Sequence, residues 1–198
     1  MLIIGSLVVL IVVSVVIGVV SSSSKSSASG SSAPTTGAPA LVKVVSLEKY
    51  HNNDWMNLAE VKIYDESGNL IPSSKLTPVL SPSWNNNNDF PASNLVNNNM
   101  DDFAHTGPDT GPTAKPFSSL DQTVKQFMQI RIEPASKVSK IEIYNRKECC
   151  KDRINDIAVK TISQSNNVLS SVQLKGSNMV HTIKYNLSNG ASSEYKSA

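Results

Sequence analysis

Residues that could do chemistry gather in one stretch, from Asn145 to Ile154. It reads Asn-Arg-Lys-Glu-Cys-Cys-Lys-Asp-Arg-Ile and holds both cysteines and two of the three arginines of the chain. If Cys149 and Cys150 bridge, their Cα atoms stay at the single-peptide distance of about 3.8 Å, which is short for a disulfide and strains the backbone. Such a bridge closes almost no loop, so it stabilises the fold little. Its use is therefore local.

The surroundings of the cysteines suggest what that local use is. Arg146 lies three residues before Cys149, and Arg153 lies three residues after Cys150. A bridged pair makes a small, rigid, apolar platform between two side chains that carry fixed hydrogen-bond donors. The alternative interpretation is two free thiols on a basic loop.

This stretch carries a family resemblance. Arg-Lys-Glu-Cys-Cys-Lys-Asp-Arg, residues 146–153, is similar to the Arg-x-Asp-Cys-Cys-x-x-Arg signature of the fucolectins. These proteins are the fucose-binding branch of the discoidin, or coagulation factor 5/8 type C, superfamily. Glu148 in place of Asp is the only departure within the motif. The resemblance implies that Cys149 and Cys150 form a disulfide that packs on an edge of a sugar ring.

Two further segments carry the same resemblance. Residues 56–65, Met-Asn-Leu-Ala-Glu-Val-Lys-Ile-Tyr-Asp, are similar to the Leu-x-Leu-x-Glu-Val-x-Val-Tyr strand that closes the domain in fucolectins. Here the strand comes early, so the resemblance implies a circularly permuted domain, which is tolerated where the termini lie close together. Residues 90–99, Phe-Pro-Ala-Ser-Asn-Leu-Val-Asn-Asn-Asn, resemble the family's Pro-Ala-Ser-Asn-Ala-x-Asp-Gly-Asn loop, which runs into a Thr-x-x-His element.

The resemblance implies a set of sugar-binding residues. His105, Arg146 and Arg153 would form hydrogen bonds to the sugar beside the Cys149–Cys150 disulfide. Arginine offers fixed donors to hydroxyl and ring oxygens, and a neutral imidazole can donate or accept. An inserted segment, residues 107–116, would stand near this pocket and could reshape or block it. The aromatic side chain that receives the methyl group of the sugar is left open among Trp84, Phe90 and Phe117.

The resemblance also implies a structural Ca²⁺ ion in the asparagine-rich loop. Ca²⁺ takes six to eight oxygen ligands, which amides, carboxylates and backbone carbonyls supply. Asn97 replaces the usual Asp and removes one negative charge, which Asp102 restores. The alternative is a loop whose asparagines simply accommodate turns. Carried over by position, the calcium ligands are Glu60, Asn94, Asn97, Asn99 and Asp102.

The remaining sequence between residues 41 and 190 indicates an all-β domain. Short alternating or β-branched runs are separated by Asn, Pro, Gly and Ser clusters, without sustained helical periodicity. This pattern favours a β-sandwich or jelly roll, and the resemblance narrows it to a discoidin, galactose-binding-like jelly roll. Predicted strands cover residues 42–47, 59–64, 127–132, 138–144, 157–162, 168–174 and 180–187.

The ends of the chain have other compositions. Residues 2–20 are apolar and uncharged, and as a helix they would span about 28 Å at ~1.5 Å per residue, enough to cross a bilayer. We expect a transmembrane anchor over 1–20, because no Lys or Arg precedes it; a cleaved signal peptide is the alternative. Residues 21–40, rich in Ser, Ala and Pro, form a disordered linker, and residues 191–198 form a tail.

Charge and missing motifs exclude several function classes. Lys plus Arg total 18 against 16 for Asp plus Glu, and the basic residues are scattered, so we expect no nucleic-acid partner. The sequence has no nucleophile–base arrangement, phosphate-binding glycine loop or zinc spacing, so we do not expect an enzyme. Asn186-Leu187-Ser188 forms an N-glycosylation sequon.

The sequence thus predicts a single-pass membrane protein whose exposed C-terminal domain is a lectin for fucosylated or related glycans, in surface recognition or adhesion. The competing hypothesis is a structural virion protein. In it the same jelly roll, as a minor capsid protein, contacts capsid or other virion proteins, and the helix attaches it to an internal virion membrane. The permuted domain behind an N-terminal anchor is similar to proteins of large DNA viruses of algae and protists.

Overall fold

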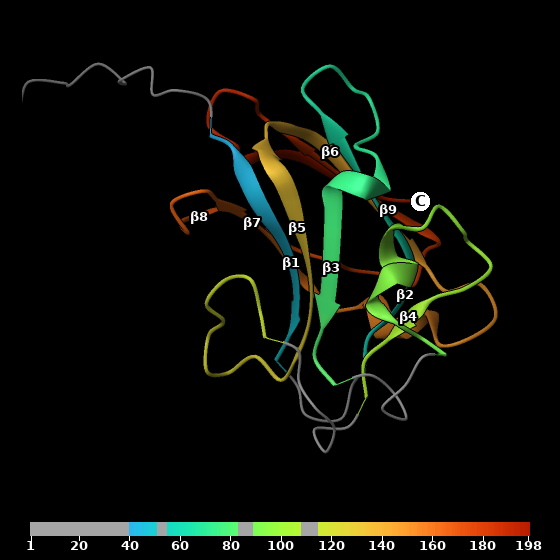
Figure 1. The fold of residues 1–198 in the computed structure, drawn as a ribbon. Coiled ribbons are helices and arrows are strands. Elements are labelled where there is room, and N and C mark those ends of the chain that lie inside the picture. Colours follow the sequence, from blue (N-terminus) through green and yellow to red (C-terminus); the bar gives the residue numbers. More distant parts are fainter. Residues whose placement is uncertain (1–39, 51–54, 83–88, 108–114) are drawn as a thin grey trace, which may run out of the picture. The chain divides into compact units, whose positions relative to one another are not determined.

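The protein is all-β in the part of the chain that the computed structural model describes, residues 40–50, 55–82, 89–107 and 115–198. Its strands there form two antiparallel five-stranded sheets, which Figure 1 shows as two layers. The first sheet has the order β3-β5-β1-β7-β8 and the second β10-β9-β6-β2-β4. The bounds are β1 Val42–Lys49, β2 Asn57–Asp65, β3 Leu76–Leu80, β4 Ala104–His105, β5 Gln126–Ser136, β6 Val138–Asn145, β7 Ala158–Ser163, β8 Val168–Gln173, β9 Val180–Tyr185 and β10 Ser192–Ser197. Three 3-10 turns lie between them: η1 Ser73–Lys75, η3 Ala92–Val96 and η4 Lys151–Ile154.

Both sheets contribute apolar side chains to one core. Leu47 of β1 and Ile130 of β5 come from the first sheet, and Ile63 of β2 and Ile143 of β6 from the second; all four are fully buried. Burying each such side chain contributes roughly 1.5–3 kcal/mol. Successive side chains of a strand point to opposite faces of its sheet. The face that carries the apolar side chains is therefore the one that packs against the other sheet.

The predicted all-β class is confirmed, and each of the seven predicted strands overlaps an observed strand. Three strands were missed. β3 contains Pro78, β4 is only two residues long, and β10 is polar and reads Ser-Ser-Glu-Tyr-Lys-Ser. Because β10 pairs with β9, most of residues 191–198, expected as a tail, belongs to the second sheet, and the domain extends past residue 190.

One irregularity in β2 directs Glu60 toward the asparagine-rich loop. Between Leu58 and Glu60 the register against β6 shifts, so that Ala59 is an extra residue on β2. A bulge of this kind re-aims the side chains next to it. Leu58 joins the core, and the Glu60 carboxylate accepts a hydrogen bond from the backbone N–H of Asn98 in the asparagine-rich loop, at 2.9 Å.

Other expectations fall outside the described residues. These are the anchor and nearly all of the linker, residues 1–39, and most of the inserted segment, residues 108–114. Across the described ranges no helix is long and apolar enough to cross a membrane.

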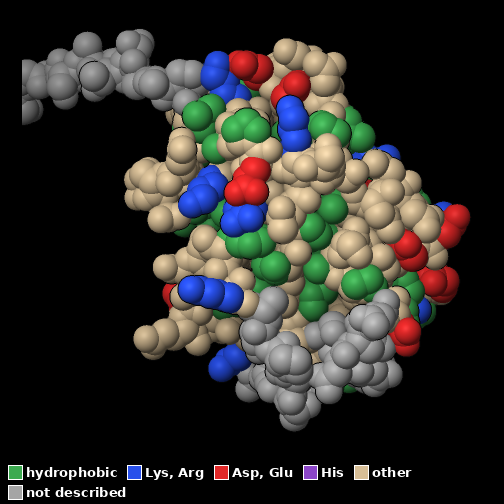
Figure 2. Space-filling model, in the orientation of Figure 1, with side chains coloured by type: hydrophobic (Ala, Val, Ile, Leu, Met, Phe, Trp, Pro, Cys, Tyr) green, Lys and Arg blue, Asp and Glu red, His purple; other side chains and the backbone are tan. Residues whose placement is uncertain are grey.

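On the face drawn in Figure 2, basic side chains are interspersed with acidic ones and do not gather into one continuous surface.

Candidate functional site

One pocket brings together residues from four separate parts of the chain. Its volume is about 270 Å³, just below the range of roughly 300–1,000 Å³ typical of sites for drug-sized ligands. It lies where β4 and the end of β6 meet the turn that begins η4. The lining residues are Trp55, Phe90, Phe103, His105, Arg146, Cys150 and Arg153.

The loop that carries both arginines is fixed at its base by Asn145, the last residue of β6. This side chain is buried, and its Oδ1 accepts the backbone N–H of Arg146 at 2.9 Å. Its Nδ2 donates to the carbonyls of Lys151 at 2.8 Å and Asn178 at 3.2 Å. Asn145 therefore closes the loop on itself and sets the spacing between Arg146 and the start of η4.

Cys149 and Cys150 form a disulfide in the middle of this loop, with Cα atoms 3.8 Å apart. Cys150 has left-handed backbone angles, φ 60° and ψ 30°, and is the residue from which η4 begins. Its carbonyl accepts the backbone N–H of Arg153 at 3.1 Å. A residue other than glycine rarely adopts this conformation, and here it turns the chain so that Arg153 reaches back over the disulfide.

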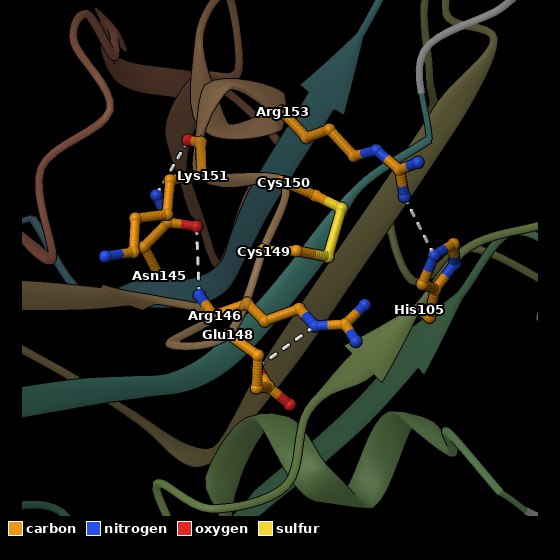
Figure 3. The surroundings of a disulfide bond; sticks show 8 residues. All are labelled: His105, Asn145, Arg146, Glu148, Cys149, Cys150, Lys151 and Arg153. Atoms are coloured by element: carbon orange, nitrogen blue, oxygen red, sulfur yellow. Dashed lines mark hydrogen bonds and ion pairs between the residues drawn. A yellow bond between two sulfur atoms is a disulfide. The ribbon is translucent and has the colours of Figure 1, made fainter.

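The two guanidinium groups lie on either side of the disulfide, and His105 faces them across the pocket, as Figure 3 shows. Arg146 Nε lies 3.1 Å from the carboxylate of Glu148, whose side chain is 56% exposed. Within the described residues no ion pair joins Arg153 to a carboxylate. Its Nη1 instead donates to His105 Nε2 at 3.1 Å.

The contacts of His105 determine its proton state. The imidazole is buried, and its Nδ1 lies 2.5 Å from the carbonyl oxygen of Thr106. A carbonyl can only accept, so Nδ1 carries the proton, and the unprotonated Nε2 accepts from Arg153. Burial lowers the pKa of His105, and the charges of Arg153 and Arg146 lower it further, against the opposing effect of the Thr106 hydrogen bond. The imidazole is therefore neutral at pH 7.

Aromatic rings form the other wall of the pocket. Phe90 and Phe103 stack with ring centroids 4.6 Å apart, and the guanidinium carbon of Arg146 lies 3.8 Å from the Phe103 ring centre. The corresponding carbon of Arg153 lies 5.6 Å from the ring of Trp55. Both distances suit cation–π contact. The rings thus orient the arginines and leave an apolar surface beside their donors.

Sequence reasoning found part of this wall. Phe90, one of the three aromatic candidates, lines the pocket, and Trp84 lies outside the described residues. Phe117 does not line this pocket, and the guanidinium carbon of Arg131 lies 4.7 Å from the centre of its ring. Trp55 and Phe103 were missed. Trp55 immediately precedes the matched segment 56–65, and Phe103 follows the matched segment 90–99. This closeness in sequence is the only signal that could have identified them.

The asparagine-rich loop is joined to the same wall. Asn94, buried in η3, donates through Nδ2 to the carbonyl of Phe103 at 3.0 Å. Asn97 and Asn99 donate through their amides to Asp102 Oδ2 at 2.9 and 3.0 Å. Their own amide oxygens accept backbone N–H groups within the loop. The loop is thereby attached to the backbone of Phe103, whose side chain lines the pocket.

Two carboxylates in this loop region have buried oxygen atoms with too few hydrogen bonds or positive charges around them to offset that burial. Asp102 Oδ1 is buried and makes no hydrogen bond. Glu60 is 1% exposed, and burial raises its pKa to about 7, although the Asn98 N–H and Lys62 lower it and Asp102 raises it further. Across the described residues no group of three or more His, Cys, Asp and Glu side chains could hold a metal. Asn97 and Asn99, expected as calcium ligands, present amide N–H groups rather than oxygens to Asp102.

The pocket can bind a small molecule that offers oxygen acceptors on one side and an apolar edge on the other. Arg146 and Arg153 have N–H groups not used in the contacts above, and the disulfide and aromatic rings provide apolar contact. Comparison with known proteins adds no assignment, because no family model, no curated protein and no solved structure matches this chain.

Proposed function

We propose that this protein is a membrane-anchored carbohydrate-binding module with a circularly permuted, fucolectin-like discoidin domain. The observation that carries the proposal is the meeting of His105, Arg146, Arg153 and the Cys149–Cys150 disulfide around one pocket. These residues come from segments up to 48 positions apart. The family resemblance names the same residues on independent grounds, namely the sequence motif.

The chemistry of the pocket suits a sugar. Guanidinium groups donate to hydroxyl and ring oxygens, and each charge-assisted bond contributes roughly 1.5–3 kcal/mol. The apolar face of a sugar ring would rest on the disulfide, and a methyl group such as that of a 6-deoxy sugar would contact Phe90 or Trp55. The neutral imidazole of His105 holds Arg153 in place without adding charge. Specificity would come from the fixed positions of these donors.

A calcium ion would complete the asparagine-rich loop. Glu60 and Asp102 would supply carboxylate oxygens, and the unpartnered Oδ1 of Asp102 supports this assignment. Asn94, Asn97 and Asn99 would contribute amide or backbone oxygens after rotation of the amides that now donate to Asp102 and Phe103. The ion would have a structural role, since the loop holds Phe103 at the pocket wall.

Attachment to a membrane compensates for weak binding at each site. A shallow sugar site gains little net free energy, because hydroxyl groups must be desolvated and side chains ordered. In this proposal residues 2–20 anchor the chain and residues 21–40 tether the domain. Many copies on one surface then bind multivalent glycans with an avidity well above the affinity of one site.

The test is a glycan panel probed with the full chain in detergent. We expect selective binding to fucosylated or related sugars that Arg153→Ala weakens about tenfold or more. Lys151→Ala is the matched control, because Lys151 lies in the same turn but does not line the pocket. A folded, disulfide-bonded protein that binds no glycan would refute the proposal and favour the structural virion role, in which the domain makes protein contacts.

A further inference from the structure

The turn between β9 and β10 contains the one Asn-x-Ser/Thr sequon of the chain, Asn186-Leu187-Ser188. The turn is a defined structure. Asn186 N–H donates to the carbonyl of Ala191 at 2.8 Å, and Gly190 N–H donates to the carbonyl of Asn186 at 2.7 Å. Gly190 has a φ of +72°, which a glycine adopts without strain. The sequon therefore lies on a closed hairpin turn at the edge of the second sheet.

The two polar residues of the sequon already contact each other. Asn186 Oδ1 accepts the backbone N–H of Ser188 at 2.9 Å and its hydroxyl at 2.5 Å. Asn186 is exposed, and its Nδ2 donates no hydrogen bond among the described residues. The amide nitrogen, which is the atom modified in N-glycosylation, thus faces solvent while the Ser188 hydroxyl is held on the amide oxygen.

The position of the turn keeps it away from the pocket. β9 begins beside Asn145, whose N–H donates to the carbonyl of Met179 at 2.9 Å, and this is the pocket end of the second sheet. β9 then runs the length of the sheet before it reaches Asn186. At that far end, Gly190 lies against Ala40, where the described domain begins, and Figure 1 shows the turn beside the start of β1.

We propose that Asn186 is an N-glycosylation site. An oligosaccharyltransferase would use a lipid-linked pyrophosphate oligosaccharide as the donor. The bond between the anomeric carbon and the pyrophosphate oxygen breaks, and a bond from that carbon to Asn186 Nδ2 forms. The lipid pyrophosphate leaves, and one amide proton passes to a base of the transferase. An attached glycan would extend into solvent, because Asn186 is exposed on the turn.

This modification fixes the orientation of the protein. Oligosaccharyl transfer occurs on the luminal side of the secretory membrane, so the C-terminal domain faces the lumen and then the outside. A glycan at the end where Ala40 enters the domain would leave the opposite end, with His105 and Arg153, open to ligands. The proposal does not depend on sugar binding by the pocket.

The experiment expresses the full chain in cultured eukaryotic cells and treats it with a peptide N-glycosidase. We expect a gel-mobility shift on treatment that Asn186→Gln and Ser188→Ala each abolish. Ser188→Thr should keep the shift, because threonine also supplies the hydroxyl. Asn189→Gln is the matched control, because Asn189 lies in the same turn outside the sequon, and it should leave the shift unchanged.

A reporter sequon separates the two ways in which the proposal can fail. Val168→Thr completes a sequon that starts at Asn166, an exposed residue of the turn between β7 and β8. If the reporter is glycosylated in Asn186→Gln but the native chain carries no glycan, the geometry at Asn186 does not make an acceptor. If neither site is glycosylated, the domain does not face the lumen. Either result overturns the proposal.

Discussion

Arg153 donates a hydrogen bond from Nη1 to His105 Nε2 at 3.1 Å, although the two residues are 48 positions apart in sequence. The bond is possible because His105 Nδ1 is already committed to the carbonyl of Thr106. The pair fixes a neutral imidazole and a charged guanidinium side by side at the pocket. A ligand therefore meets a preorganised donor group, and little side-chain entropy remains to be lost on binding.

Replacing Arg153 should remove most of the ligand affinity. A charge-assisted hydrogen bond contributes roughly 1.5–3 kcal/mol, so Arg153→Ala should weaken binding about tenfold or more. Arg153→Lys should not restore it, because an ammonium lacks the planar fork that reaches both His105 and a ligand. Calorimetric titration with the best sugar from the panel measures this, and unchanged affinity in Arg153→Ala would contradict the proposed site.

Sugar binding should resist mild acid. Since burial and the two arginines lower the pKa of His105, the imidazole stays neutral as pH falls through its usual value of about 6.5. We expect a flat affinity from pH 8 to pH 6.5 and a loss only at lower pH, measured by titration over this range. Affinity that halves between pH 7.5 and 6.5 would show that His105 titrates normally.

The same lowered pKa affects stability with a definite sign. Below about pH 6.5 the unfolded chain binds a proton at His105 that the folded domain does not, so the free energy of unfolding falls as pH falls. His181, whose pKa is lowered by burial, acts in the same direction. Denaturant unfolding should therefore show less pH dependence in His181→Gln, whereas the pH profile of sugar binding should not change in that variant.

Strands could be predicted from the sequence where one of their faces is buried, because burial requires apolar residues at alternate positions. β6 reads Val-Ser-Lys-Ile-Glu-Ile-Tyr-Asn, and its alternation matches its buried and half-buried positions, so a period of two identifies it. β10 has no such pattern, because it is an edge strand whose side chains are mostly exposed or half-buried. Its place in the sheet comes from backbone pairing with β9 across a hairpin turn, and backbone pairing imposes no hydrophobic pattern on an exposed edge strand.

The site was predictable where a motif fixes chemistry locally. Arg146, the cysteines and Arg153 lie within eight residues, and a vicinal cysteine pair is conspicuous in any sequence. Trp55 and Phe103 reach the same pocket only through the packing of β2 and the asparagine-rich loop. The role of Asn145 could not be predicted either. The sequence does not distinguish a buried asparagine that closes a loop from the many asparagines in turns.

Reduction of the disulfide should weaken binding and leave the fold intact. The bridge closes almost no loop, so its loss costs little stability. However, Cys150 has φ 60°, a conformation that costs a non-glycine residue about 1–3 kcal/mol and that orients η4. Without the bridge this turn can relax, and Arg153 moves away from His105. We expect affinity to fall at least tenfold in a dithiol reductant while thermal unfolding changes little.

The control for that experiment is the Cys149→Ser, Cys150→Ser double variant. Both cysteines of the chain are in the bridge, so the reductant has no other target in this protein. The double variant should bind as weakly as the reduced protein and should not respond to reductant. Full binding by the reduced protein would show that the disulfide does not shape the pocket.

Calcium should stabilise the domain in a manner that depends on pH and on Glu60. Burial raises the pKa of Glu60 to about 7, so between about pH 4.5 and 7 the folded, metal-free domain holds a proton that the unfolded chain has lost. The free energy of unfolding therefore falls as pH rises through this window. Ca²⁺ competes with that proton for the carboxylate, so its stabilising effect should grow with pH.

Thermal unfolding at pH 5.5 and pH 8, with and without Ca²⁺, tests both parts of this argument. At 100 times its dissociation constant the ion adds about 2.7 kcal/mol, which should appear as a higher Tm at pH 8 and a smaller increase at pH 5.5. Glu60→Gln should lose the calcium response. Glu66→Gln, which removes an exposed carboxylate bound to Lys137, should keep it. An equal response in both variants would place the ion elsewhere, because then Glu60 contributes no ligand.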